Sequence, residues 1–166
     1  MNWAKVSWFP FEFGLYWNYK YELERITLKL SPKPGLKVEH MSSKTVLKAL
    51  ERFLIELERY FKKETPFLEV PHTLKVSDFT KRVLFKLREI RLGETRTYKD
   101  IAESLGLKRG YQAVGQALKL NPLPLLYPCH RVISKTGLGG FSQGLLVKWL
   151  LIYWELNGDL TCASNF

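Results

Sequence analysis

The sequence predicts an α/β N-terminal domain followed by a mainly helical C-terminal domain, within a chain of 166 residues. Residues 1–40 alternate apolar and polar positions in short runs, which is typical of strands. Residues 42–64 carry apolar side chains at helical spacing, and residues 97–122 have the pattern of two short helices joined by a glycine-containing turn. We place the domains at residues 1–74 and 75–166, because prolines concentrate just before that boundary.

The N-terminal domain is expected to contain a small antiparallel sheet and one long helix. "YELERITLKL" alternates as a half-buried strand does, and "SPKPG" ends the alternation. The helix begins near Ser42 or Ser43, either of which is a suitable N-cap. The apolar positions of its buried face are Val46, Leu50, Phe53, Leu57, Tyr60 and Phe61. Beyond it, "TPFLEVPHTLKVS" with Pro66 and Pro71 predicts an extended linker.

The C-terminal domain is expected to contain a helix over residues 78–92 and then a helix-turn-helix pair, whose first member spans residues 97–106. Thr97 is a suitable cap for that member, and Gly106 ends it. The second member carries small side chains, including Gly115, that cannot read a base. Either this helix approaches a partner surface closely, which favours shape-based contact, or it packs tightly inside the protein.

The charge is uneven along the chain, whose net charge is +10. Residues 75–135 hold 13 basic and 5 acidic side chains, a net +8, whereas residues 1–74 hold 12 and 9, a net +3. An excess of positive charge indicates a polyanionic partner, most often nucleic acid. The alternative is a surface rich in Lys and Arg, as in thermophilic proteins.

The two cysteines, Cys129 and Cys162, have neither metal-ligand spacing nor the pattern of a disulfide framework, so we expect a reducing, intracellular (cytoplasmic) setting. The first residues lack the pattern of a secretory signal. The most apolar segment, "GLLVKWLLIYWEL", is short and carries Lys148, so we expect a buried helix and no membrane contact.

The segment "YPCHRVIS" sets the thiol of Cys129 beside the imidazole of His130. A thiolate is the nucleophilic form of cysteine, and a nearby base favours it. A third group should orient the imidazole, and Glu155 or Asp159 could do so. The alternative for a free cysteine is a small buried apolar residue, which is the interpretation we adopt for Cys162.

The segment "NPLPLLYPCHRVIS" resembles the signature of the alkylguanine-DNA alkyltransferases, which repair O6-alkylated guanine in DNA. The resemblance extends to "FTKRVLFKL", "TYKDIAESLG", "AVGQALKLNP" and "GLGGFSQGL", and to the spacing from Lys148 to Glu155. It is strong over about residues 75–155 and weaker over residues 44–74. It implies a ribonuclease-H-like sheet in the N-terminal domain and a winged helix-turn-helix-like C-terminal domain.

The resemblance also implies a chemistry. The damaged base is flipped out of the duplex, and the thiolate of Cys129 displaces the alkyl group from O6. His130, through a water and held by Glu155, takes the thiol proton, while Tyr98 donates to the guanine ring and Asn121 braces the active-site turn. The product is a thioether, so each molecule acts once as a methyltransferase, without a cofactor. The expected partner is double-stranded DNA containing O6-alkylguanine, bound by a monomer.

Further residues are implied to contact the base or the duplex. The carbonyl groups near Cys129 and Val132 would accept the guanine amino group, and the Ser142 backbone N–H would point at O6. The base-binding residues expected in all are Val132, Gly140, Phe141 and Ser142. The residues expected to contact DNA are Arg109, Tyr111, Gln112, Ala113, Gly115 and Arg131.

The sequence departs from the family pattern at Gln112, where an arginine commonly wedges into the base stack. Glutamine is shorter and uncharged, so it should hold the gap less well; Tyr111, Arg109 or Lys108 could compensate. The zinc site of some relatives needs N-terminal cysteines, and none precedes Cys129, so we expect no metal.

Two other classes stay open. A non-catalytic sensor of DNA damage with the same architecture would lack the nucleophile, but Cys129 is present. An unrelated cysteine hydrolase would use Cys129 and His130 but would need an oxyanion hole and turn over an ester or amide.

Overall fold

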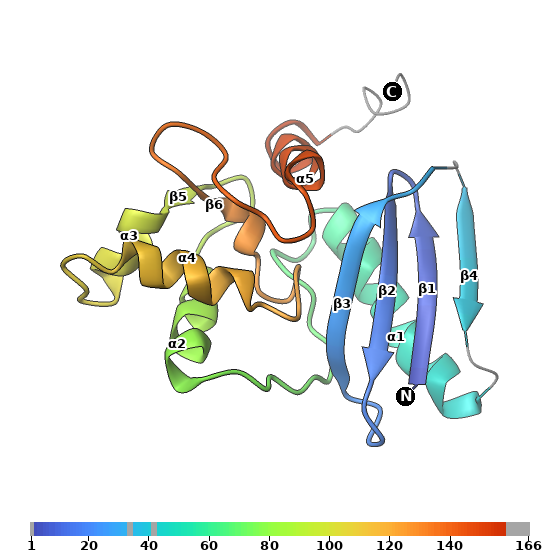
Figure 1. Cartoon of the computed structure of the whole chain (residues 1–166). Coiled ribbons are helices and arrows are strands. Elements are labelled where there is room, and N and C mark those ends of the chain that lie inside the picture. The colour runs from blue at the N-terminus through green and yellow to red at the C-terminus, as the bar shows by residue number, and fades with distance from the viewer. Residues whose placement is uncertain (1, 33–34, 41–42, 159–166) are drawn as a thin grey trace.

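A computed structural model describes residues 2–32, 35–40 and 43–158. A four-stranded sheet forms one side of the molecule, and a group of shorter helices forms the other (Figure 1). The sheet lies in the N-terminal part of the chain, and most of the shorter helices lie in the C-terminal part.

The sheet is antiparallel throughout, with the strand order β3-β2-β1-β4. Its strands are β1 (Asn2–Trp8), β2 (Phe11–Trp17), β3 (Leu23–Leu30) and β4 (Leu36–His40). Val6 and Phe13 face each other across the β1–β2 pair and are fully buried, while Lys5 and Glu12 form an ion pair at 3.3 Å. The alternation in the sequence thus divides the two faces of the sheet, and the predicted antiparallel sheet is confirmed.

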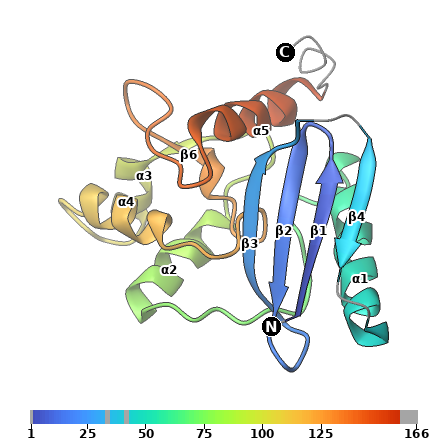
Figure 2. The same ribbon diagram turned by 45° about the vertical axis from the view of Figure 1, so that its right-hand side comes forward.

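The helix α1 (Lys44–Phe61) covers one face of the sheet (Figures 1 and 2). Its predicted apolar stripe is buried from Val46 to Tyr60, and Phe61 packs against the same core. Ser43 occupies the N-cap position but its side chain makes no capping hydrogen bond, and Ser42 lies outside the described residues.

The segment between α1 and α2 (Asp78–Leu87) has no helix and runs extended, as its prolines predict. It is held in place by backbone pairing with β3, since the Leu23 N–H donates to the Pro71 carbonyl and the Thr73 N–H donates to the Leu23 carbonyl, each at 2.9 Å. The linker therefore fixes the edge strand rather than leaving it open.

The C-terminal half contains short helices around the cysteine segment. They are α2, α3 (Tyr98–Ser104), α4 (Tyr111–Lys119), the 3-10 turn η1 (Cys129–Arg131) and α5 (Leu145–Asn157), with the short strands β5 (Arg96–Thr97) and β6 (Val132–Ile133) paired in parallel. Thr97 caps α3 in a reciprocal capping box with Asp100, as its position predicts. The predicted helix over residues 78–92 is shorter, because tight i→i+3 hydrogen bonds replace the helical pattern after Leu87.

The two halves share one continuous core. The helix α5 lies across one end of the sheet (Figure 2), and the rings of Tyr60 on α1 and Trp154 on α5 lie 5.0 Å apart. Backbone of β3 also donates to the C-terminal half, from the Ile26 N–H to the Pro122 carbonyl at 2.8 Å. No helix within the described ranges combines the length and apolarity needed to cross a membrane.

Candidate active site

The segment before the cysteine is a tight turn held by Asn121. The buried amide Nδ2 of Asn121 donates to the Tyr127 carbonyl at 2.9 Å and to the Cys129 Sγ at 3.1 Å, and its Oδ1 accepts from the Leu123 N–H at 3.0 Å. Leu125, between them, is fully buried with a left-handed φ of 71°, a conformation that costs a non-glycine residue about 1–3 kcal/mol. Asn121 thus lies where a brace for the turn was predicted.

Behind the cysteine, His130 and Glu155 form a buried pair. The His130 Nε2 lies 2.5 Å from the Glu155 Oε1, and both side chains are shielded from solvent. The other ring nitrogen, Nδ1, has no hydrogen-bond partner within the described protein. Glu155 therefore occupies the orienting position; Asp159, the alternative considered from the sequence, lies outside the described residues.

Burial sets the protonation of this group. It raises the pKa of the Cys129 thiol, against the opposing effects of Asn121 and Lys148. It lowers the pKa of His130, although Glu155 opposes the shift. Burial alone would raise the pKa of Glu155, but the hydrogen bonds from His130 and Arg131, together with the positive charge of Arg131, hold that pKa far below its ordinary value. At neutral pH the arrangement is therefore a neutral thiol, a neutral imidazole that can accept a proton, and a carboxylate.

Lys148 and Tyr98 hold the loop that follows β6. The buried Lys148 Nζ donates to the Val132 carbonyl at 2.6 Å and to the Gly140 carbonyl at 3.0 Å. Burial lowers its pKa to about 8. The Tyr98 hydroxyl donates to the Gly140 carbonyl at 3.3 Å and accepts from the Gly140 N–H at 3.2 Å. A Cβ at Gly139, whose φ is +71°, would lie 2.7 Å from that hydroxyl, so this position requires glycine.

A cavity of about 720 Å³ opens between α4 and this loop, with Cys129 in its wall. Its lining residues are Tyr98, Tyr111, Gln112, Ala113, Gly115, Gln116, Leu118, Lys119, Cys129, Gly140, Phe141 and Ser142. Most of the residues predicted to contact base or DNA therefore surround one space. An added Cβ at Gly115 would meet only the Tyr98 ring, at an ordinary contact distance of 3.8 Å, so packing inside the protein does not demand glycine there.

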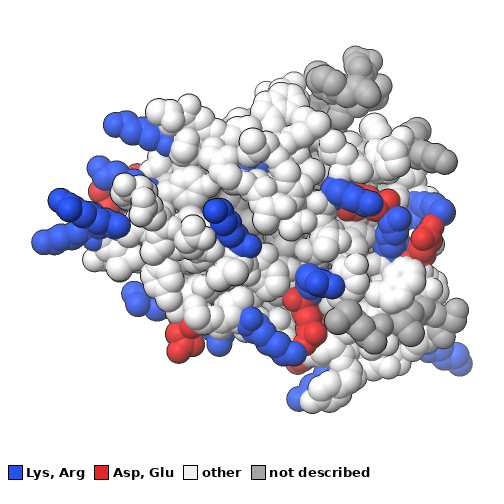
Figure 3. Space-filling view, viewed as in Figure 1, with Lys and Arg blue, Asp and Glu red and all other residues white. Residues whose placement is uncertain are grey.

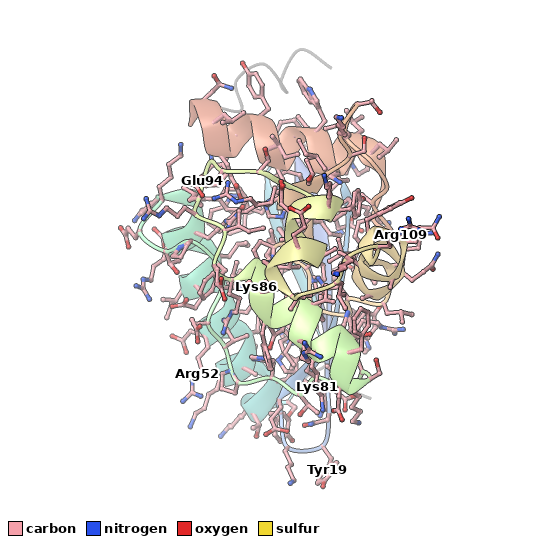
Figure 4. The ribbon with its side chains drawn as sticks, turned by 90° about the vertical axis from the view of Figure 1, so that its left-hand side faces the viewer. Tyr19, Arg52, Lys81, Lys86, Glu94 and Arg109 are labelled. Atoms are coloured by element: carbon pink, nitrogen blue, oxygen red, sulfur yellow. The ribbon has the colours of Figure 1, made fainter. Side chains whose placement is uncertain are left out.

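The surface near the cavity, at the α3–α4 loop, is basic. Lys and Arg side chains gather at the end of the molecule formed by the α3–α4 loop, with few acidic ones in view (Figure 3). Lys108 and Arg109 lie in that loop and are exposed, and Arg109 points away from the body of the molecule (Figure 4). Lys119, at the end of α4, adds a cation beside the cavity. Arg109 itself is not among the residues that line the cavity.

Arg131 was predicted to contact DNA, and this prediction is wrong. Its side chain is fully buried: the guanidinium donates to Glu155 at 2.9 Å, to the Ile90 carbonyl at 2.9 Å and to the Pro66 carbonyl. A guanidinium consumed by these partners cannot reach a phosphate. Val132 is also buried, and its carbonyl already accepts from Lys148, which leaves one lone pair for a ligand.

Three participants were missed in the sequence. Lys148 was noted only as part of a spacing, although a lysine inside an apolar helix signals a buried, paired amine. Lys119 and Gln116 line the cavity one helical turn from Gln112 and Gly115. Cys162 lies outside the described residues, and within those residues no group of three His, Cys, Asp or Glu side chains could hold a metal.

A buried thiol backed by a histidine–carboxylate pair, beside a helix-turn-helix pair with a basic rim, defines a cysteine-nucleophile protein built on a DNA-binding type of helix pair. Residues 78–157 match the family model described as the DNA binding domain of 6-O-methylguanine DNA methyltransferase. The chain belongs to the 6-O-methylguanine DNA methyltransferase family.

Individual relatives agree with this assignment. A probable methylated-DNA–protein-cysteine methyltransferase of Acanthamoeba polyphaga mimivirus is 38% identical over 113 residues, which is 67% of this chain and 76% of that protein. The methylated-DNA–protein-cysteine methyltransferase of Metallosphaera sedula is 45% identical over 106 residues, which is 63% of this chain and 65% of that protein. The chain spans between half and two thirds of the first curated relatives it matches.

A solved structure extends the likeness to the N-terminal half. The crystal structure of Mycobacterium tuberculosis OGT in complex with DNA is similar to this chain with a TM-score of 0.71 at 27% identity, covering 97% of both chains.

Proposed function

We propose that this protein repairs DNA by transferring an alkyl group from O6 of alkylated guanine to its own Cys129, once per molecule. The observation that carries the proposal is the position of Cys129. Its thiol accepts a hydrogen bond from Asn121 and lies in the wall of the cavity beside the helix-turn-helix pair. The names of the relatives support the same activity.

In this proposal the thiol is activated only when a proton can leave it. His130 takes the proton, through a water at Nδ1, and Glu155 stabilises the resulting imidazolium. The thiolate sulfur then forms a bond to the alkyl carbon while the bond between that carbon and O6 breaks, and the electron pair stays on the guanine. When the base enters, the Tyr98 hydroxyl exchanges the Gly140 carbonyl for the guanine ring as its acceptor, and the Ser142 N–H donates to O6. The thioether has no leaving group that restores the thiol, so the protein is consumed without a cofactor.

The partner is double-stranded DNA, and the target base enters the cavity by flipping. The small residues Ala113 and Gly115 let α4 approach the duplex, and Gln112 or Tyr111 fills the gap left by the base. Lys108, Arg109 and Lys119 contribute the phosphate contacts.

We extend the proposal to the finer architecture and the setting. The four antiparallel strands followed by a helix support a ribonuclease-H-like N-terminal domain at residues 1–74, and the β5–β6 pair beside α3 and α4 supports a winged helix-turn-helix-like domain from residue 75. The protein acts inside the cell, with DNA, as a monomer.

The test is the intact mass of the protein after incubation with a duplex that contains one O6-methylguanine. Transfer adds about 14 Da, the mass of one methylene, to the peptide that contains Cys129 and to no other. Cys129→Ser should bind the duplex as the unmodified protein does but gain no mass. A hydrolase would turn over without a stable adduct, and a sensor would bind without one. An adduct on Cys162 instead would overturn the proposal.

A further inference from the structure

The carboxylate of Glu155 is contacted from the N-terminal half of the molecule. The Tyr60 hydroxyl, on α1, donates to the Glu155 Oε1 at 2.7 Å. The same oxygen lies 2.5 Å from the His130 Nε2. One oxygen atom thus joins a side chain of the long N-terminal helix to the imidazole beside the reactive thiol.

This hydroxyl has no alternative position. Tyr60 is fully buried, and its ring is held between Phe61 at 5.4 Å and Trp154 at 5.0 Å. Burial, and after it the neighbouring charge of Glu155, raises the pKa of Tyr60 well above its ordinary value, so the hydroxyl stays a donor. Lys63, three residues further on and beyond the end of α1, donates to the Glu155 backbone carbonyl at 3.0 Å and anchors the same stretch of α5.

We propose that Tyr60 is a positioning residue for alkyl transfer, whose hydroxyl fixes the carboxylate of Glu155 against His130 and limits how strongly that carboxylate raises the basicity of the imidazole. The inference rests on the proposed function of Cys129, since His130 is its base. It adds to the reaction a group that lies outside the matched DNA-binding segment.

The direction of the effect follows from the shared oxygen. Oε1 is shared by the Tyr60 hydroxyl, the His130 Nε2 and the Arg131 guanidinium, whose Nη2 and Nε lie 3.0 and 3.2 Å away. Donors that share one carboxylate oxygen each reduce the negative charge felt by the others. Without the Tyr60 hydroxyl, Oε1 stabilises the imidazolium of His130 more strongly, so the pKa of His130 rises. The other charged or titratable groups that face this pair are Arg131 and Lys63 on Glu155, and Lys148 and Cys129 on the side of the thiol. The substitution changes none of them.

The test compares Tyr60→Phe with the unmodified protein. The substrate is the free base O6-benzylguanine, so no duplex has to be opened, and the transfer rate is measured as a function of pH. His130 must be neutral to accept the thiol proton, so the acid limb of the profile should move to higher pH, by about 0.5 unit for the loss of one hydrogen bond. The plateau rate should fall about three- to tenfold because the carboxylate is less well held.

Three further variants separate positioning from stability. Thr80→Val removes a comparably buried hydroxyl, which accepts a hydrogen bond from the Ser77 hydroxyl at the start of α2, and should leave the rate and the profile unchanged. In a Glu155→Gln background, Tyr60→Phe should produce no further pH shift, because the shared carboxylate is gone. Should Tyr60→Phe fold poorly, 3-fluorotyrosine at position 60 supplies a stronger donor and should move the acid limb to lower pH.

An acid limb that stays in place in both the Phe and the fluorotyrosine variants would overturn the inference and leave only a packing role for Tyr60. A pH shift that persists in the Glu155→Gln background would overturn it as well. The proposed function fails instead if the unmodified protein gains no methyl group on Cys129 from the duplex that contains O6-methylguanine. If it gains that group but accepts no benzyl group, the same pH profiles are measured with the duplex, so the two failures stay distinct.

Discussion

At the scale of single residues, the resting state of Cys129 matters most. The neighbouring histidine predicts an activated thiol, but the burial of both groups raises the pKa of the thiol and lowers that of the imidazole. A buried thiolate and imidazolium would be higher in free energy than the neutral pair. We therefore expect the proton to leave Cys129 only when a bound substrate reacts with the thiolate. Reactivity therefore depends on the occupant of the cavity.

This arrangement predicts slow reaction with a general thiol reagent. Iodoacetamide should modify Cys129 at neutral pH more slowly than it modifies free cysteine, because a raised pKa leaves less thiolate. The rate should increase with pH and reach its midpoint above about 8.5, the ordinary value for cysteine. The measurement is the rate of mass gain on the Cys129 peptide in the absence of DNA. A midpoint below that of free cysteine would contradict the neutral resting state.

Gln112 gives a second prediction at this scale. It lies on α4 at the cavity, where the family resemblance implies an arginine that fills the space of the flipped base, and its amide fills less space. Gln112→Arg should speed transfer from duplex DNA, because a stacking contact of this kind contributes about 1–3 kcal/mol. Transfer from the free base should change far less, since no stack is opened.

The duplex and free-base rates should be measured on the same preparation, with Gln116→Arg, one turn further along α4, as the matched control. If Gln112→Arg slows duplex transfer, or changes both rates equally, then another residue already fills the gap. Tyr111, which is exposed and lines the cavity, would be the leading candidate.

At the scale of elements, α4 is less stable than it could be. Gly115 lies inside the helix, and a methyl group there would find ordinary contact distances within the protein. Gly115→Ala should therefore raise the free energy of unfolding by about 0.5–1 kcal/mol. The same methyl group would stand in the cavity wall and keep the helix from the duplex, so DNA affinity should fall. Thermal unfolding and a DNA-binding titration measure the two effects; a variant that is more stable and binds DNA equally well would contradict the role of Gly115.

The elements also mark where sequence reasoning succeeds. The sheet, α1 and the capped start of α3 follow from local signals: alternation in "YELERITLKL", the stripe from Val46 to Tyr60, and Thr97 as a cap. Each signal lies within one element, so no knowledge of the fold is needed to detect it.

The errors arise where partners are distant in the chain. Arg131 was expected to contact DNA from the family resemblance, whereas its carboxylate partner Glu155 lies 24 residues further along the chain. Tyr60 was identified only as an apolar position, because no local pattern in the sequence indicates a contact with Glu155, which lies 95 residues further along the chain. The cysteine segment and its resemblance to a known family supplied Asn121, His130 and Glu155 correctly as neighbours, but not the groups that hold them.

At the scale of the whole molecule, the charge is concentrated on the half that holds the cavity. Residues 75–135 carry a net +8, and Lys108 and Arg109 in the α3–α4 loop are exposed to solvent. Affinity for duplex DNA should therefore fall steeply with salt and depend little on sequence, because phosphate contacts release counterions. A binding titration across salt concentrations tests this prediction. If the affinity does not change with salt concentration, the positive charge does not serve DNA binding and has another role, such as thermal stability.

The hydrogen bond between Tyr60 and Glu155 bears on how this protein and its relatives can diverge. A boundary near residue 74 suggests two modules that could be inherited or exchanged separately. However, the Tyr60 hydroxyl, in the module with the sheet, donates a hydrogen bond to Glu155, in the module with the thiol. A chimera that joins residues 1–74 of one relative to residues 75–166 of another would fold around the shared core only if α1 meets α5 correctly. It would keep the proton relay only if it inherits a donor at position 60 together with an acceptor at position 155. If Tyr60 acts as proposed, the chemistry therefore constrains a helix that lies outside the cavity, and residues 60 and 155 are expected to be inherited together.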